Sequence, residues 1–259
     1  MSGVAVVIPA AGRGTRLGLD VPKLFAPLGG GQTVWTVLRR RALAAADHVH
    51  VVLSPFALPF FERSAAGDLS SGQASFSVQE EPLGMGDAVF KGRARWGGFD
   101  HIVVMWGDQV GVSEQTLRRV ADALRVSRRP TVVLPLVATK DPYVDYVFQG
   151  DRLERVLQSR EGDGCRAEGL ADVGVFGLGV QGLLDAWTRY EKLGVRGART
   201  GEANFLPFLP YLADPATGGW PVVPVEVADP EEARGINTLE DLAHFQRSIQ
   251  GDTTTRRGS

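Results

Sequence analysis

The stretch VVIPAAGRGTRLGLDVPK, residues 6–23, contains the most informative pattern in the chain. An apolar run ends at Pro9 and is followed at once by a loop with two glycines and two arginines, and then by a lysine. Such a run predicts a buried strand, and in open α/β sheets ligands bind beyond the carboxyl ends of the strands. Gly12 and Gly14 let backbone N–H groups approach an anion closely, while Arg16 and Lys23 add positive charge. The loop therefore predicts a binding site for a polyphosphate.

Two common phosphate-binding loops do not fit this stretch. A dinucleotide-binding fingerprint requires a third glycine three residues after Gly14, where the chain has Leu17. A P-loop requires Gly-Lys-Ser or Gly-Lys-Thr, which does not occur here. From spacing alone, a glycine-rich turn with solvated arginines stays open as the alternative.

The composition narrows the class of protein. The chain has 259 residues, is 44% hydrophobic and carries a formal net charge of −2, so a nucleic-acid partner is not expected. A single cysteine, Cys165, excludes an internal disulfide framework and a zinc site built on several cysteines. No apolar stretch approaches the ~20 residues that span a bilayer, and the start of the chain lacks the pattern of a signal peptide. We expect a cytoplasmic protein with no membrane partner.

Apolar runs and helical patterns alternate along the first half of the chain. The runs that predict strands are residues 4–9, 48–53, 74–79, 101–106 and 131–136. The stretches that predict helices are residues 33–45, 86–96 and 114–126, the last with Ser113 as its N-cap. This alternation predicts an α/β fold, with a Rossmann-like, mostly parallel sheet flanked by helices.

The second half is less regular and predicts an inserted, β-rich part that binds an acceptor. Residues 143–148 and 152–158 predict a hairpin, and residues 172–179 and 221–226 predict further strands. Helices are expected over residues 183–192 and 236–249. We expect a single domain over residues 1–250 and a disordered polar tail over residues 251–259.

Three later segments carry side chains suited to a nucleotide and a metal. Gln79 precedes a glycine-rich turn, and its amide can both donate to and accept from a base edge. Asp108 directly follows an apolar strand, where its carboxylate suits Mg²⁺. Asn237 stands before the closing helix, and either Asn237 or Thr238 could cap that helix instead of binding a ligand. A capping or turn role for Asp108 is the matching alternative.

Taken in order, these segments resemble a known family. Ala-Ala-Gly-x-Gly-Thr-Arg-Leu followed by Pro-Lys is similar to the signature loop of the nucleotidyltransferase family that includes the sugar-1-phosphate nucleotidylyltransferases, among them the uridylyltransferase domain that makes UDP-N-acetylglucosamine. The segments QEEPLGMGDAV, WGDQ and RGINTLEDL resemble its base-recognition segment, its Gly-Asp metal ligand and its late asparagine ligand. Four motifs in the same order cover nearly the whole chain.

The resemblance implies a role for each matching residue. Arg16 and Lys23 are the expected catalytic cations, and Asp108 and Asn237 are the expected ligands of a Mg²⁺ cofactor. The expected nucleotide-binding residues are Ala10, Ala11, Gly12, Gly14, Thr15, Gln79, Gly84, Met85 and Gly107. The expected acceptor-binding residues are Glu161, Asp172, Gly174 and Glu202.

Two residues depart from the family pattern. Asp172 replaces an asparagine, so an ionised side chain there can only accept hydrogen bonds, which suits ring hydroxyls. Met85 stands where the uridylyltransferase type has threonine, which leaves the base open.

The implied function is transfer of a nucleoside monophosphate from an NTP to a sugar-1-phosphate or a sugar-like cyclitol phosphate, with release of pyrophosphate. A cytidylyltransferase for an alditol, phosphonate or cofactor phosphate is one alternative, and a non-catalytic subunit that binds nucleotide sugars is the other. The sequence specifies neither the acceptor, the base, the pathway nor the oligomeric state, and it leaves a homo-oligomer open.

Overall fold

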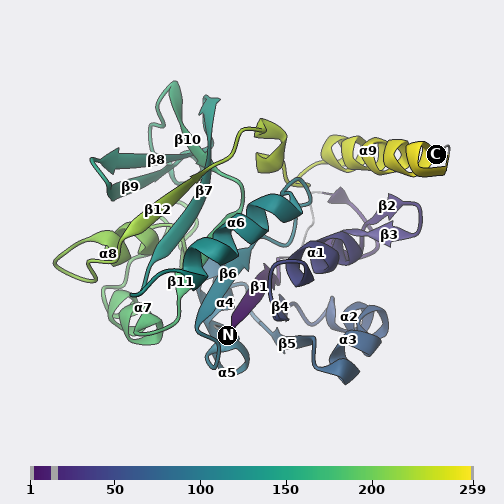
Figure 1. The fold of residues 1–259 in the computed structure, drawn as a ribbon, viewed down its shortest axis with the longest axis horizontal. Helices are drawn as coiled ribbons and strands as arrows, with labels where there is room; N and C mark the ends of the chain where they lie inside the picture. The colour runs from purple at the N-terminus through teal and green to yellow at the C-terminus, as the bar shows by residue number, and fades with distance from the viewer. Residues whose placement is uncertain (1–2, 13–16, 258–259) are drawn as a thin grey trace.

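A computed structural model describes residues 3–12 and 17–257, with side chains up to residue 249 (Figure 1). Within these residues, eight strands form one sheet in the order β10–β7–β11–β6–β1–β4–β5, and β12 also pairs with β7. The strands are β1 (Val4–Ala10), β4 (His48–Leu53), β5 (Ala74–Val78), β6 (His101–Met105), β7 (Val132–Lys140), β10 (Glu168–Asp172), β11 (Val175–Gly179) and β12 (Val222–Glu226).

The two halves of the sheet differ in strand direction. Strands β5, β4, β1 and β6 run parallel to one another, so their carboxyl ends meet at one edge. Strand β11 enters between β6 and β7 in the opposite direction, and β10 is also antiparallel to β7. The predicted α/β fold with a mostly parallel sheet is confirmed, and the antiparallel strands come from the predicted β-rich part of the chain.

Both faces of the sheet are covered by helices. Val4, Val6 and Ile8 of β1 point to one face, while Ala5 and Val7 point to the other, because successive side chains of a strand alternate. The first face packs against α1 (Val34–Leu43), α2 (Leu58–Ser64), α3 (Ala66–Ser71), α6 (Glu114–Arg125) and the start of α9 (Leu239–Arg257). The second face packs against α4 (Met85–Lys91), α5 (Arg93–Trp96), α7 (Leu183–Lys192) and α8 (Phe208–Ala213).

Local signals in the sequence set several helix ends. The Ser113 hydroxyl accepts a hydrogen bond from the Thr116 N–H, so the predicted N-cap of α6 is confirmed. The single helix predicted over residues 86–96 is wrong, because the chain divides at Gly92 into α4 and α5. A Cβ atom on Gly92 would lie 2.3 Å from Nε2 of the buried His50, so the backbone approaches that ring closely at the break.

Two hairpins and the last helix complete the fold. The predicted hairpin forms as β8 (Val144–Gln149) and β9 (Arg152–Gln158), and β8 lies beside β10. A small hairpin of β2 (Pro27–Gly29) and β3 (Gln32–Thr33) packs against α9, where Gln246 Nε2 donates to the Pro27 carbonyl. Figure 1 shows α9 extending past this hairpin; the helix ends at Arg257 and so includes most of the stretch predicted as a tail. None of the helices among the described residues is both long and apolar enough to cross a membrane.

Candidate active site

A cleft of about 440 Å³ opens at the edge where the parallel strands end. Segments after β1, β5 and β6 form its walls, together with loops from the β-rich part. The predicted site residues that line it are Ala10, Ala11, Gly12, Lys23, Gln79, Gly84, Met85, Gly107, Asp108, Glu202 and Asn237. The sequence thus predicted most of the polar lining, and the cleft lies where open α/β sheets bind their ligands.

Lys23 and Asp108 meet inside this cleft. Lys23 begins the short 3-10 helix η2 (Lys23–Phe25), whose next two side chains are buried and hold the turn in place. Its Nζ lies 2.9 Å from Oδ2 of Asp108, and each side chain is 22% exposed. A cation and a carboxylate that remain partly open to a cleft can exchange partners when a charged ligand enters.

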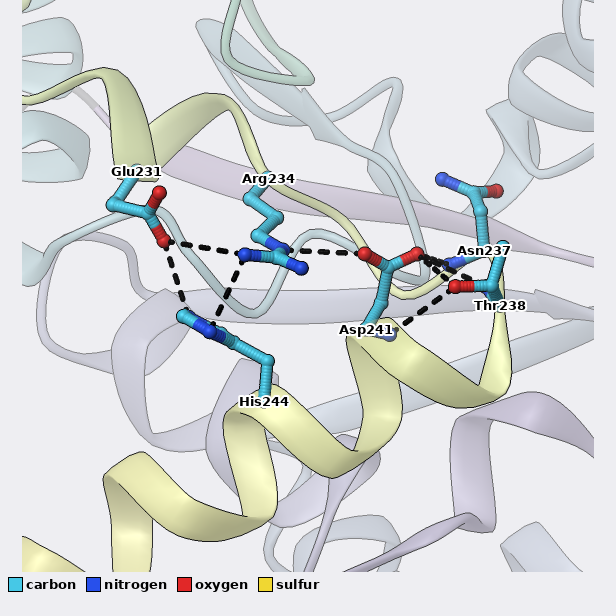
Figure 2. Close-up of polar contacts among 6 residues, drawn as sticks. All are labelled: Glu231, Arg234, Asn237, Thr238, Asp241 and His244. Carbon is cyan, nitrogen blue, oxygen red and sulfur yellow. Dashed lines mark hydrogen bonds and ion pairs between the residues drawn. The ribbon is translucent and has the colours of Figure 1, made fainter.

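Asn237 also lines this cleft, and Thr238, not Asn237, caps α9. The Thr238 hydroxyl accepts a hydrogen bond from the Asp241 N–H, and the Asp241 carboxylate accepts one from the Thr238 N–H (Figure 2). This reciprocal pair is a capping box for α9. Because Thr238 provides the cap, the Asn237 side chain is available to line the cleft.

Gln79 and Gly84 line the cleft from the segment that follows β5 in the chain. Gln79 is buried, and its Nε2 donates to Oδ2 of Asp87 at 2.6 Å and to the Gly84 carbonyl at 3.3 Å. Gly84 has a φ of 114°, and a Cβ atom there would lie 2.7 Å from the backbone of Ala203. Only glycine fits this close approach at positive φ. The close approach brings the predicted base-recognition segment against the loop that carries Glu202.

The cleft lining also contains residues that sequence reasoning missed. Trp106 lines it and packs its ring 4.7 Å from Phe176. Arg160 also lines it and forms an ion pair with Glu202, with Nη2 3.2 Å from Oε1. The remaining lining residues absent from the sequence prediction are Pro9, Leu17, Leu24, Pro82 and Ala88. Arg160 directly precedes the predicted Glu161, so the charged pair Arg-Glu was the signal for it.

Three predicted acceptor residues are not part of this cleft lining among the described residues. Glu161 accepts hydrogen bonds from the backbone N–H groups of Arg199 and Thr200 and from the Thr200 hydroxyl. These bonds, led by the one from Arg199, hold the pKa of Glu161 below its ordinary value. Glu161 therefore links the segment after β9 to the loop that contains Arg199 and Thr200.

Asp172, which is half-buried, and the buried Gly174 form a turn between β10 and β11. Asp172 accepts hydrogen bonds from the Tyr146 hydroxyl at 3.0 Å and from the Gly174 N–H at 2.7 Å. Burial raises the pKa of Asp172 despite these bonds. The Gly174 carbonyl in turn accepts from the Trp106 N–H, so this turn supports the cleft wall from behind.

The predicted residues Gly14, Thr15 and Arg16 lie outside the described residues. Within the described ranges, no group of three or more His, Cys, Asp or Glu side chains could hold a metal ion. Asp108 and Asn237 nevertheless provide a carboxylate and an amide oxygen on one cleft. Mg²⁺ commonly takes one or two protein oxygens and completes its shell with phosphate oxygens and waters, so this donor set fits it.

Comparison with known proteins agrees with this geometry. A family model, the MobA-like NTP transferase domain, matches residues 6–171. The chain therefore belongs to the MobA-like NTP transferase domain family, and the predicted membership of a nucleotidyltransferase family is confirmed.

Relatives with curated names point the same way. The chain is 33% identical over 253 residues to "Bifunctional protein GlmU" of Ruegeria sp. (strain TM1040), covering 95% of this chain and 53% of that protein. It is 29% identical over 253 residues to the protein of the same name from Acidithiobacillus ferrooxidans (strain ATCC 53993 / BNL-5-31), covering 95% and 51%. The chain thus spans about half the length of the curated relatives it matches.

Solved structures share the fold. A putative glucose-1-phosphate thymidylyltransferase from Bacillus anthracis has a TM-score of 0.72 at 14% identity, covering 95% of this chain and 94% of that one. A CMP:2-keto-3-deoxy-manno-octonic acid synthetase complexed with CTP has a TM-score of 0.70 at 17% identity, covering 97% and 100%. At these identities the likeness concerns the Rossmann-like fold, which is the one predicted.

Proposed function

We propose that this protein transfers a nucleoside monophosphate from an NTP to a phosphorylated sugar or sugar-like acceptor, with Mg²⁺ as cofactor and pyrophosphate as the second product. The observation that carries the proposal is the contact of Lys23 Nζ with Asp108 Oδ2 at 2.9 Å, in a cleft that Asn237 also lines. A cation for phosphates and two oxygen ligands for a metal are the minimum that this chemistry needs.

The reaction requires positioning and charge neutralisation rather than a general base. An acceptor phosphate is already ionised at neutral pH, so its oxygen can attack the α-phosphorus in line with the departing pyrophosphate. Lys23 would leave Asp108 and neutralise charge on the nucleotide phosphates, together with Arg16. Asp108 and Asn237 would hold Mg²⁺, which supplies charge stabilisation for the phosphates when it is bound.

The base would lie against the wall formed by Gln79 and Gly84. Because Gln79 Nε2 already donates to Asp87 and Gly84, its Oε1 is the amide atom left to accept from the ligand. A base N–H group satisfies this acceptor. The acceptor substrate would meet Trp106, Arg160 and Glu202, which also line the cleft.

The first experiment measures thermal unfolding with ATP, GTP, CTP, UTP and dTTP, each with and without Mg²⁺. A ligand at 100 times its dissociation constant stabilises a protein by about 2.7 kcal/mol, so the preferred nucleotide should raise the melting temperature visibly. Release of pyrophosphate is then measured with that nucleotide and a panel of sugar-1-phosphates, cyclitol phosphates and alditol phosphates.

Asp108→Asn separates an enzyme from a binding subunit. We expect this variant to lose at least about 100-fold in turnover, since one charged group at the reacting phosphates is worth that much. Asp122→Asn, at an exposed ion pair on α6, serves as the control and should keep the wild-type rate. If the nucleotide binds but no acceptor releases pyrophosphate, the protein is a binding subunit and the proposal is wrong.

A further inference from the structure

The segment between η4 (Pro230–Ala233) and α9 carries Asn237 and is hydrogen-bonded to the backbone of Asp108, so it connects the two proposed metal ligands. Asp108 and Asn237 are far apart in the chain, yet the Ile236 N–H donates to the Asp108 carbonyl at 2.9 Å. The side chain of the next residue, Gln109, donates through Nε2 to the Glu232 carbonyl at 2.7 Å. The backbone at Asp108 and the segment that carries Asn237 are therefore joined by direct hydrogen bonds.

Asp241 holds the other end of this segment. Its Oδ2 accepts three hydrogen bonds, from the Asn237 N–H at 3.1 Å, the Thr238 N–H at 3.0 Å and the Thr238 hydroxyl at 2.9 Å (Figure 2). Burial acts to raise the pKa of Asp241, but these bonds and the one from Arg234 outweigh it and leave the pKa below its ordinary value. The hydrogen bonds between Asp241 and Thr238 are enough to cap the helix. The additional hydrogen bond from the Asn237 N–H connects Asp241 to the proposed metal ligand itself.

Arg234 orients Asp241 from the other side. Its Nε donates to Asp241 Oδ1 at 3.1 Å, and its Nη1 lies 3.3 Å from Nδ1 of His244 and 3.8 Å from Oε2 of Glu231 (Figure 2). His244 Nε2 in turn lies 3.1 Å from the same Glu231 oxygen. The Arg234 guanidinium is thus held by three side chains. One oxygen of the Asp241 carboxylate accepts from Arg234, and the other accepts from Asn237 and Thr238.

We propose that Asp241, oriented by Arg234, is a positioning residue that fixes the Asn237 backbone so that the Asn237 side chain stays on the cleft beside Asp108. This inference rests on the proposed function, because it takes Asn237 as a metal ligand. Residues that hydrogen-bond to a metal ligand and orient it commonly contribute to binding of the metal, and removing one typically costs about 10–100-fold in metal affinity.

The test measures binding of Mn²⁺, as a stand-in for Mg²⁺, by electron paramagnetic resonance in the presence of the preferred NTP and without acceptor. We expect Asp241→Ala to weaken Mn²⁺ binding by about 10-fold or more, while the affinity for NTP without metal stays near the wild-type value. The double variant Asn237→Ala/Asp241→Ala should bind Mn²⁺ no more weakly than Asn237→Ala alone, since both changes remove the same contribution. Asp241→Asn, which keeps an acceptor oxygen but loses the charge toward Arg234, should lie between wild type and Asp241→Ala.

Two further variants separate positioning from loss of stability. Asp68→Ala removes the buried partner of Arg39 on α1, so it should destabilise the fold without changing Mn²⁺ binding. Arg234→Gln leaves Asp241 in place and should weaken Mn²⁺ binding by less than Asp241→Ala, which provides a measurement even if Asp241→Ala does not fold.

The outcomes are distinguishable. If Asn237→Ala weakens Mn²⁺ binding and neither Asp241→Asn nor Arg234→Gln does, the positioning role is wrong and the metal site stands. If neither Asp108→Asn nor Asn237→Ala changes Mn²⁺ binding, the metal assignment of the proposed function is wrong, and the positioning role with it.

Discussion

Two parts of the cleft lining are built in different ways. The part where we propose that the nucleotide binds is made by segments that follow the parallel strands β1, β5 and β6, so its residues are placed by strand geometry. Arg160 and Glu202 come from loops of the antiparallel part, and these two charged side chains are held by each other in an ion pair. In the same part, but outside the lining, Tyr146 donates to Asp172.

This difference separates residues that face a ligand from residues that support the site. Where we propose that the nucleotide binds, Lys23 and Asp108 remain partly exposed on the cleft. In the β-rich part, Asp145 is fully buried and its carboxylate accepts hydrogen bonds from Arg166 and from the Leu170 N–H. We therefore expect substitutions of the exposed cleft residues to change the reaction, and substitutions of buried pairs in the β-rich part to change stability.

The largest effect is expected from Lys23→Ala. Removing this cation should lower the rate of pyrophosphate release by about 10²–10³, because it neutralises charge that develops on the phosphates. The melting temperature without ligand should change little, since the Lys23–Asp108 pair is partly exposed. Steady-state kinetics with the preferred NTP check this, with the exposed Lys91→Ala as the control. A wild-type rate in Lys23→Ala would contradict contact with the phosphates.

The next effect concerns stability in the β-rich part. Arg166→Ala leaves the buried Asp145 carboxylate without its guanidinium partner, and we expect a loss of roughly 2–3 kcal/mol in the free energy of unfolding. Half of the Arg166 side chain is exposed, which keeps the loss at the lower end for such pairs. Urea denaturation measures it, and Arg152→Ala, which removes only an exposed contact with Gln149, should cost little. A variant as stable as wild type would mean that the pair does not support this part of the fold.

Tyr146→Phe tests whether Asp172 supports the site or faces the acceptor. The change removes one donor from the half-buried Asp172 carboxylate, so the free energy of unfolding should fall by about 1–2 kcal/mol. The KM for the acceptor should change less than threefold, with the exposed Tyr143→Phe as the matched control. A large rise in KM with unchanged stability would instead place Asp172 among the residues that bind the acceptor.

The smallest effect concerns the dependence of stability on pH. Burial, followed by the charges of His48 and Arg95, lowers the pKa of His50 from 6.5 to about 3. The folded protein therefore keeps His50 neutral, while the unfolded chain binds a proton below pH 6.5. Stability is full above pH 6.5 and is lost toward pH 3, by up to about 1.4 kcal/mol per pH unit for this one proton.

Urea denaturation at pH 7.5 and pH 5.5 measures this slope. His48 and His101, whose pKa values are also lowered mainly by burial, add to it in the same direction. His50→Asn should show a shallower dependence on pH than wild type, even if it is less stable at pH 7.5. An unchanged slope would mean that His50 is not the source of the proton uptake.

Much of the first half could be predicted because its signals are local. Strand β4 has the predicted bounds, and Ser113 caps α6 as predicted. Asp108 could be placed on the cleft because it directly follows a buried strand whose end must lie at the ligand-binding edge. The break at Gly92 could not be predicted, since it depends on the ring of His50 from another strand.

The α/β class, the parallel strands β1, β4, β5 and β6 and most polar residues of the cleft lining follow from the sequence alone, because each depends on periodicity or on the position of a residue after a strand. Which charged side chains of the second half face the cleft depends on tertiary contacts. Arg160 lines it, whereas Glu161 turns to Arg199 and Thr200 and Asp172 turns to Tyr146. A carboxylate binds whichever donors the fold brings within reach, and Tyr146, Arg199 and Thr200 lie 26 or more residues away in the chain from the carboxylates they contact.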